Sequence, residues 1–190
     1  MENPDDGGIV RSGNLVVTPR VTDSLLAQAY LTYEKEGTLP VIFYLKIPTI
    51  KAFIDAHMEV GPRVTLGCFR IDEGSNTPTF TGLGWVSDSV RIGKYCKAEI
   101  GIGMFRSAGK DNLAFGKMML QCFFQQYPID VLFGCTPDEN KLALRYAQKL
   151  GFSLHGPIPQ YCSWGDKLSD AWISHMSKEE WIERNRPIPL

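Results

Sequence analysis

The stretch that decides the fold is KAEIGIGMFRSAGK, residues 97–110. Alternation along residues 97–105 predicts a strand, with Glu99, Gly101, Gly103 and Phe105 on one face and Ala98, Ile100, Ile102 and Met104 on the other. Two glycines on one face weaken a strand. We therefore expect a bulge, a helix packed closely over the glycines, or a ligand that approaches bare backbone beside the Glu99 carboxylate.

The segment RSAGK, residues 106–110, joins this strand to a helical pattern. Backbone N–H groups at a helix start, with Arg106 and Lys110 beside them, favour a bound diphosphate, and the alternative is an ordinary solvated turn. A Walker loop is excluded because Gly103 lies six residues before Gly109 and Asp111 replaces the hydroxyl. A dinucleotide fingerprint is excluded because Arg106 stands where its last glycine should be.

Outward from this stretch, hydrophobic periodicity predicts one mixed sheet with helices. Residues 63–71, 79–87 and 97–105 are expected to form an antiparallel meander. Residues 14–18 and 131–135 are expected to be strands and residues 152–167 a hairpin, with helices over 22–36, 47–58, 112–126 and 137–150. We predict a single domain over residues 14–182, between a flexible start at 1–13 and a loose tail at 183–190.

The helix over residues 137–150 carries the best-defined start and stop signals. Thr136 and Glu139 are spaced as a capping box, with Pro137 in the first turn. Leu142, Tyr146 and Leu150 are expected to form the packing stripe, and Gly151 to end the helix.

Composition favours an intracellular globular protein without a metal site. The chain has 190 residues, of which 44% are hydrophobic, enough for a sizeable core. A formal charge of -1 argues against nucleic-acid and membrane partners. The start is acidic, which excludes a secretory signal, and no apolar run reaches transmembrane length. Five widely spaced cysteines and three histidines without ligand spacing predict no metal and a cytoplasmic location.

Residues 98–105, the turn 106–109, then Asn140, Ala143 and residues 149–152 resemble the GNAT superfamily of acetyl-coenzyme-A-dependent N-acetyltransferases. The resemblance covers about residues 14–176. It implies an α/β fold with a central, mostly antiparallel sheet flanked by helices, and acetyl-coenzyme A as cosubstrate. It points to the branch that modifies protein N-termini or to a phage-type branch, for which the location would be the host cytoplasm.

The resemblance also implies a set of site residues. The turn would bind the coenzyme diphosphate, the preceding strand would pair its backbone with the pantetheine arm and polarise the acetyl carbonyl, and the asparagine helix would lie across the coenzyme. Glu99 would accept the amine proton, unless it is merely solvated or ion-paired, and Tyr161 or Ser163 would protonate the thiolate, although Tyr161 also suits packing. The coenzyme-binding candidates are Gly101, Ile102, Gly103, Met104, Arg106, Ser107, Ala108, Gly109, Lys110, Asn112 and Asn140.

Two residues depart from the family pattern. Asp111 replaces a glycine or alanine, and its carboxylate would oppose a phosphate or cap the following helix. Ala147 stands where many members carry a tyrosine acid, while Tyr146, one residue away, is interpreted as core. They motivate the alternative of a catalytically degenerate scaffold that acts as a binding or structural protein. For an active enzyme we expect an amine-bearing acceptor, either a protein or a small molecule. Exposed strand edges would also suit a homodimer.

Overall fold

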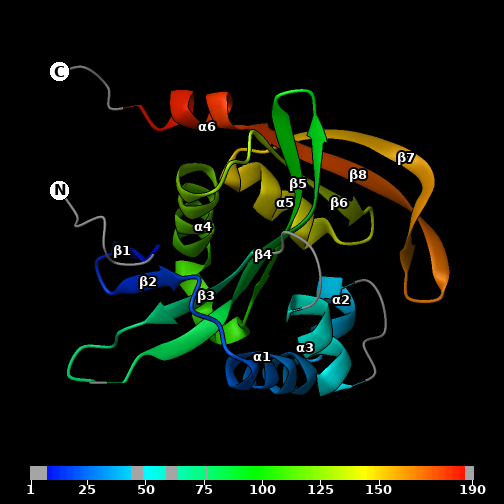
Figure 1. The fold of residues 1–190 in the computed structure, drawn as a ribbon. Helices are drawn as coiled ribbons and strands as arrows, with labels where there is room; N and C mark the ends of the chain where they lie inside the picture. Colours follow the sequence, from blue (N-terminus) through cyan, green and yellow to red (C-terminus); the bar gives the residue numbers. More distant parts are fainter. Residues whose placement is uncertain (1–7, 44–48, 59–63, 76, 187–190) are drawn as a thin grey trace.

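A computed structural model describes residues 8–43, 49–58, 64–75 and 77–186 of the chain. Across these residues, the strands form one 8-stranded sheet in the order β1-β2-β3-β4-β5-β6-β8-β7, with helices on both faces (Figure 1). Only β5 and β6 pair in parallel among the pairs described. The predicted fold class, a mixed and mostly antiparallel sheet flanked by helices, is confirmed. The strands are β1 (Val10–Ser12), β2 (Leu15–Thr18), β3 (Val64–Arg70), β4 (Thr79–Ile92), β5 (Tyr95–Met104), β6 (Val131–Pro137), β7 (Ser153–Trp164) and β8 (Lys167–Ser177).

The helices divide into two layers with separate cores. One layer packs α1 (Asp23–Glu36) and α3 (Ile50–Met58) over β4 and the end of β5, around Leu26, Tyr33, Phe53, Leu83 and Phe105. The other layer packs α4 (Asn112–Gln126) and α5 (Lys141–Leu150) against the opposite face. Three shorter elements complete the chain: α2 (Leu39–Phe43), the 3-10 helix η1 (Arg106–Asp111) and α6 (Lys178–Arg184).

The predicted meander over β3, β4 and β5 is confirmed, because consecutive strands pair antiparallel. Several elements were missed. β1 lies inside the segment expected to be flexible, β8 continues the final hairpin to Ser177, and α6 occupies part of the expected tail. The predicted helix over 47–58 is α3 from Ile50 onward, and its residues 47–48 lie outside the described part, as do residues 1–7 and 187–190.

The predicted capping box of α5 is wrong. Thr136 and Pro137 are still in β6, because β6 remains paired with β8 as far as Pro137 and Ala171. The helix begins later, and Asn140 caps it by accepting the Ala143 N–H at 3.2 Å. Asparagine is an equally good N-cap residue, so the later start carries no loss. The Glu139 carboxylate instead accepts the Ser169 hydroxyl.

The packing stripe of α5 was only partly right. Leu142 was expected to be buried, yet it is 77% exposed. Leu144 and Leu150 are the buried leucines, and Tyr146 and Ala147 pack against the same core. The buried stripe therefore runs through Leu144, Ala147 and Leu150. Residues three apart also lie on one side of a helix. Gly151 ends the helix in the left-handed conformation, as predicted.

Tyr146 belongs to the core between α4 and α5. Its hydroxyl donates to the Asn112 carbonyl at 2.7 Å, and burial raises the pKa of its phenol. It lies so close to Gly116 that a Cβ there would be 2.4 Å from the hydroxyl oxygen. The interpretation of Tyr146 as a packing residue is therefore confirmed.

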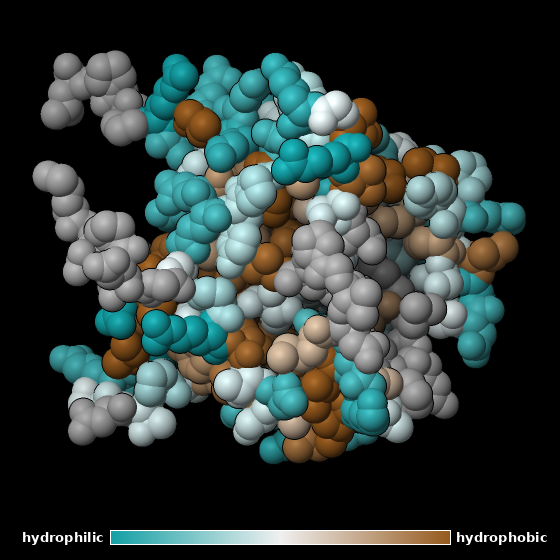
Figure 2. All heavy atoms as spheres, viewed as in Figure 1, coloured by the Kyte–Doolittle hydropathy of each residue, from teal (hydrophilic) through white to brown (hydrophobic). Residues whose placement is uncertain are grey.

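The surface seen in Figure 2 is mostly hydrophilic over α6, at the top of the view. Within the described residues, no helix is both long and apolar enough to span a membrane.

We predict that Gly116→Ala destabilises the protein although alanine favours helix. The propensity gain of about 1 kcal/mol opposes an overpacking cost of roughly 1–3 kcal/mol, because the new methyl meets Tyr146 and Leu150. The free energy of unfolding, measured in urea, should fall by up to about 2 kcal/mol, the difference between these two terms. Ala114→Gly, at an exposed position of the same helix, measures the propensity term alone. A Gly116→Ala gain that matches the Ala114→Gly loss would show that the contact with Tyr146 has no cost.

Candidate active site

The candidate site lies where β5 and β6 stop pairing. These two strands are paired only from Lys97 with Val131 to Glu99 with Phe133. Beyond that point β6 continues beside β8 alone, while β5 continues beside β4 as far as Met104. Among the described residues, the β6-facing edge of β5 from Gly101 to Met104 therefore has no strand partner.

The polar groups on that unpaired edge belong to the even-numbered residues of β5. Phe105 donates its N–H to Thr81 of β4 at 2.9 Å, which places the odd-numbered backbone groups toward β4. Cys96 instead accepts from the Asp130 N–H at 2.8 Å, on the β6 side. The N–H groups of Ile102 and Met104, two of the predicted coenzyme-binding residues, therefore point to the unpaired edge. Those of Gly101 and Gly103 face β4.

The glycine face of β5 is covered by large side chains. A Cβ on Gly101 would lie 2.1 Å from the Trp85 ring, and one on Gly103 would lie 2.8 Å from the Tyr33 hydroxyl. Tyr33 comes from α1 and Trp85 from β4, and both belong to the aromatic layer around Phe53. The expected close packing of a helix is borne out at Gly103, which Tyr33 of α1 covers, whereas Gly101 is covered by Trp85 of the neighbouring strand.

The predicted diphosphate turn is η1. Ala108 is buried, while Arg106, Ser107, Gly109 and Lys110 are exposed. Gly109 has φ 55° and ψ -123°, a conformation that favours glycine, and open space surrounds it. The Arg106 backbone N–H is already bonded to both carboxylate oxygens of Glu36, at 3.1 and 3.0 Å. Glu36, at the end of α1, thus places a carboxylate at the start of this turn.

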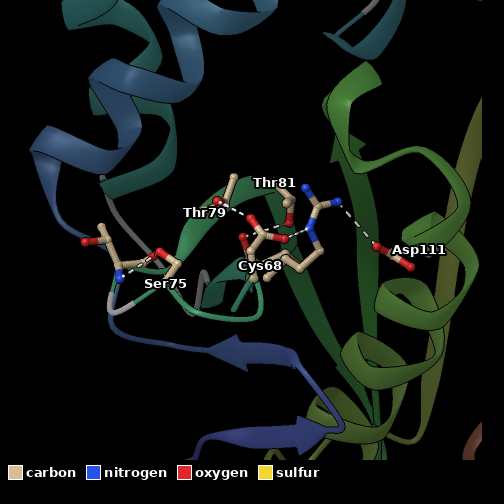
Figure 3. Close-up of polar contacts among 8 residues, drawn as sticks. Cys68, Ser75, Thr79, Thr81 and Asp111 are labelled. Carbon is tan, nitrogen blue, oxygen red and sulfur yellow. Dashed lines mark hydrogen bonds and ion pairs between the residues drawn. The ribbon is translucent and has the colours of Figure 1, made fainter.

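Asp111 does not cap α4, contrary to one expectation from the sequence. Its carboxylate lies 3.4 Å from the Arg70 guanidinium, which also binds Asp72 at 2.8 Å. Figure 3 shows Asp111 on one side of this polar chain and Thr79, which donates to Asp72, on the other. Hydrogen bonds from Arg70 and Thr79 lower the pKa of Asp72. The charge of Asp111 is thus partly compensated by a cation of β3.

The side chains of the two predicted asparagines differ in their hydrogen bonds. Asn140 is only 7% exposed: its side-chain oxygen caps α5, and its amide nitrogen donates to the Val41 carbonyl at 3.2 Å. It therefore ties α2 to the start of α5. Asn112 begins α4, and its side-chain oxygen is buried without a hydrogen-bond partner among the described residues.

Glu99 stands at the last β5–β6 pair, between Ser87 of β4 and Phe133 of β6. Burial, and secondarily Cys162 and Glu99, raises the pKa of the Cys135 thiol to about 11. Cys135 and Cys162 are also hydrogen-bonded to each other. The structure thus gathers Glu99, Cys135 and Cys162 at one place, and sequence reasoning missed both thiols.

Tyr161 and Ser163 flank Cys162 on β7. Cys162 pairs with Ser169 of β8, and Ser163 pairs with Leu168 of β8. The side chains of Cys162 and Ser163 therefore face opposite sides of the hairpin. Tyr161 is 59% exposed. Cys162 is the residue of this stretch that lies beside Cys135. Strand alternation along residues 161–163, which separates Cys162 from its two neighbours, was the sequence signal that could have identified Cys162.

A metal centre has no evident ligand set in the described ranges. No group of three or more His, Cys, Asp and Glu side chains there is arranged to hold an ion. The cysteines are free thiols, with Cys68 and Cys122 buried and Cys96, Cys135 and Cys162 partly exposed.

Comparison with known proteins shows similarity at the level of structure. No family model and no curated protein matches the sequence. Among solved structures, a Salmonella typhimurium acetyltransferase that modifies the N-terminal serine of ribosomal protein L7/L12 has a TM-score of 0.70 at 14% identity, over 89% of this chain and 98% of that one.

Two further structures agree over nearly the whole chain. The ribosomal-protein-S5-alanine acetyltransferase of Vibrio fischeri has a TM-score of 0.72 at 11% identity, covering 91% of this chain and 98% of its own. The spermidine N-acetyltransferase of Vibrio cholerae, in complex with coenzyme A and spermine, has a TM-score of 0.67 at 11% identity, covering 90% and 99%. The GNAT fold expected from the resemblance is therefore confirmed, and this chain shares the fold of these N-acetyltransferases.

Proposed function

We propose that this protein is an N-acetyltransferase in which an acceptor amine attacks acetyl-coenzyme A directly. One observation carries the proposal: the unpaired edge of β5 runs from Glu99 to Met104 and leads directly into the η1 turn. A carboxylate, a row of backbone donors and an exposed turn with Arg106 and Lys110 thus follow one another along the chain. That order matches the three parts of the cosubstrate: the reacting thioester, the amide-bearing arm and the diphosphate.

The β5 edge supplies the binding and polarising groups. The Met104 N–H suits the pantetheine arm, and the Ile102 N–H, nearer to Glu99, suits the thioester oxygen as negative charge develops on it. Gly101 and Gly103 contribute indirectly, since they let Trp85 and Tyr33 pack against the strand. The turn residues Ser107, Ala108, Gly109 and Lys110, with Asn112, would line the diphosphate. Asn140 would act by holding α2, through its bond to Val41.

Glu99 is the proposed base, and it would take the proton of the attacking amine directly or through water. Tyr161 and Ser163 stay proposed donors to the departing thiolate. The Cys135 thiol lies within the field of Glu99 and adds a third source of a proton, because a thiol with a pKa raised to about 11 is protonated at neutral pH.

The acceptor class follows from charge. The Cys162 thiol lies within the field of two carboxylates, Glu139 and Asp170, and the Cys135 thiol within that of Glu99. Three carboxylates around the two thiols suit a cationic amine. The similar structures include enzymes named for a protein N-terminal serine and for spermidine. A protein N-terminus and a polyamine are therefore the acceptors to compare first.

A catalytically degenerate scaffold is the second candidate. Two contacts favour it: the Tyr146 hydroxyl is held by the Asn112 carbonyl, and the Glu36 carboxylate already binds the first N–H of the turn. A scaffold could still bind the coenzyme without transferring its acetyl group.

The first test is thermal stabilisation by the cosubstrate. At about one hundred times the dissociation constant, acetyl-coenzyme A should add roughly 2.7 kcal/mol to the free energy of unfolding. For a chain of this size the melting temperature should then rise by roughly 5–10 °C. Adenosine diphosphate at the same concentration is the control and should give a smaller shift. The absence of any shift at millimolar acetyl-coenzyme A would contradict the proposed function.

We predict that Glu99→Gln lowers kcat by about 10²- to 10⁴-fold, the usual contribution of a general base. Glutamine keeps the shape of the side chain, so the dissociation constant for coenzyme A should stay the same. Steady-state kinetics with a peptide and with spermidine would measure the first effect, and calorimetry the second. Glu73→Gln, at an exposed carboxylate in the turn between β3 and β4, is the matched control. Turnover that survives Glu99→Gln at every pH would remove Glu99 from the mechanism.

A further inference from the structure

The buried phenol of Tyr33 is bonded to the backbone of β5. Tyr33 is fully buried in α1, and its hydroxyl donates to the Gly103 carbonyl at 2.5 Å. Burial raises the pKa of this phenol far above its ordinary value, although the neighbouring Leu83 N–H lowers it in part. Tyr33 is therefore a neutral hydrogen-bond donor at every physiological pH. Leu83 and Gly103 are direct partners in the β4–β5 ladder, so the hydroxyl contacts both strands at one pair.

The Gly103 carbonyl shares a peptide plane with the Met104 N–H. In a trans peptide these two groups point in opposite directions. The Gly103 carbonyl points to the β4 side, where the ladder with Leu83 and the Tyr33 hydroxyl both hold it, so the Met104 N–H points to the unpaired edge. A bond to the carbonyl of a peptide also polarises its N–H and strengthens it as a donor. Tyr33 thus both orients and strengthens the Met104 donor.

Gly103 is the residue that makes this contact possible. A Cβ at that position would lie 2.8 Å from the Tyr33 hydroxyl oxygen and 3.2 Å from the Ile42 side chain. Real Cβ atoms do not approach an oxygen so closely. Any side chain at position 103 would push the hydroxyl away from the carbonyl.

Met104 lies between the two ends of the proposed site. It is two residues before Arg106 at the start of η1, and five residues after Glu99, or about 16 Å along the strand. A donor at this distance from Glu99 is too far to contact a thioester beside that carboxylate. It is placed for the amide-bearing arm that joins the diphosphate to the thioester.

We propose that Tyr33 is a positioning residue for the cosubstrate: its hydroxyl fixes the Gly103–Met104 peptide so that the Met104 N–H binds an amide carbonyl of the pantetheine arm. This inference rests on the proposed function, since it assumes that coenzyme A lies along β5. It assigns Tyr33 to coenzyme affinity and not to the chemical step.

The test is Tyr33→Phe, which removes the hydroxyl and keeps the ring in the aromatic cluster with Phe53 and Phe105. Loss of one oriented hydrogen bond should weaken coenzyme A binding by about 2- to 10-fold in calorimetry. Binding of adenosine diphosphate, which lacks the arm, should be unchanged, as should kcat at saturating acetyl-coenzyme A. Tyr30→Phe, at another buried tyrosine of α1, is the matched control and should leave coenzyme A affinity as it is.

Two results would overturn the inference alone: coenzyme A binding that is unaffected by Tyr33→Phe, or equal losses of affinity for coenzyme A and adenosine diphosphate. The second result would mean that the hydroxyl only supports the fold. A wild-type protein that binds no coenzyme A would overturn the proposed function itself.

A measurement on the wild type covers the case in which Tyr33→Phe does not fold. The Met104 amide proton, followed by nuclear magnetic resonance on ¹⁵N-labelled protein, should move downfield when coenzyme A is added and stay in place with adenosine diphosphate. An amide signal that does not respond to bound coenzyme A would refute the assignment.

Discussion

The constraint on which the candidate site depends is the short pairing between β5 and β6. Three register pairs join them, and the last is Glu99 with Phe133. Had the pairing continued, the N–H groups of Ile102 and Met104 would have been used in the sheet. Because it stops, a buried sheet presents hydrogen-bonding backbone along one internal edge, where an unpaired polar group is costly unless a ligand or water satisfies it. The same end of pairing places the Glu99 carboxylate at the head of that edge.

The divergence of the two strands is supported from both sides. β6 is held by β8 through seven register pairs, from Val131 with Ser177 to Pro137 with Ala171, so it cannot follow β5. β5 is held by β4, and its two glycines let Trp85 and Tyr33 pack directly onto it. Close packing therefore fixes the strand whose outer edge must stay available. A stiff strand loses little further entropy when a ligand binds along it.

The sequence was sufficient for the elements whose signals are local. Alternation along residues 97–105 predicted the even-numbered residues of β5 and the glycines on opposite faces, and the structure shows the even-numbered residues in the core with α4 and the glycines on the other face. The start of α5 could not be read from the sequence, because Thr136 and Asn140 are both good caps. The choice depends on how far β6 pairs with β8, a contact across 34 residues at Pro137 and Ala171. Cys135, Cys162 and Tyr33 were missed for the same reason, since only tertiary packing brings them to Glu99 and Gly103.

Helix α1 is connected to the end of β5 and the start of η1 through two contacts. Tyr33 bonds to the carbonyl of residue 103, and Glu36, three residues later, bonds to the N–H of residue 106. Residues three apart lie on one side of a helix, so the end of α1 grips the segment that joins β5 to η1. One contact leaves a donor, the Met104 N–H, for the coenzyme arm, while the other occupies a donor of the turn. A phosphate and the Glu36 carboxylate would compete for that N–H. If coenzyme A lies along β5 as proposed, its binding is linked to the position of α1, and by reciprocity a ligand that moves α1 would change coenzyme affinity.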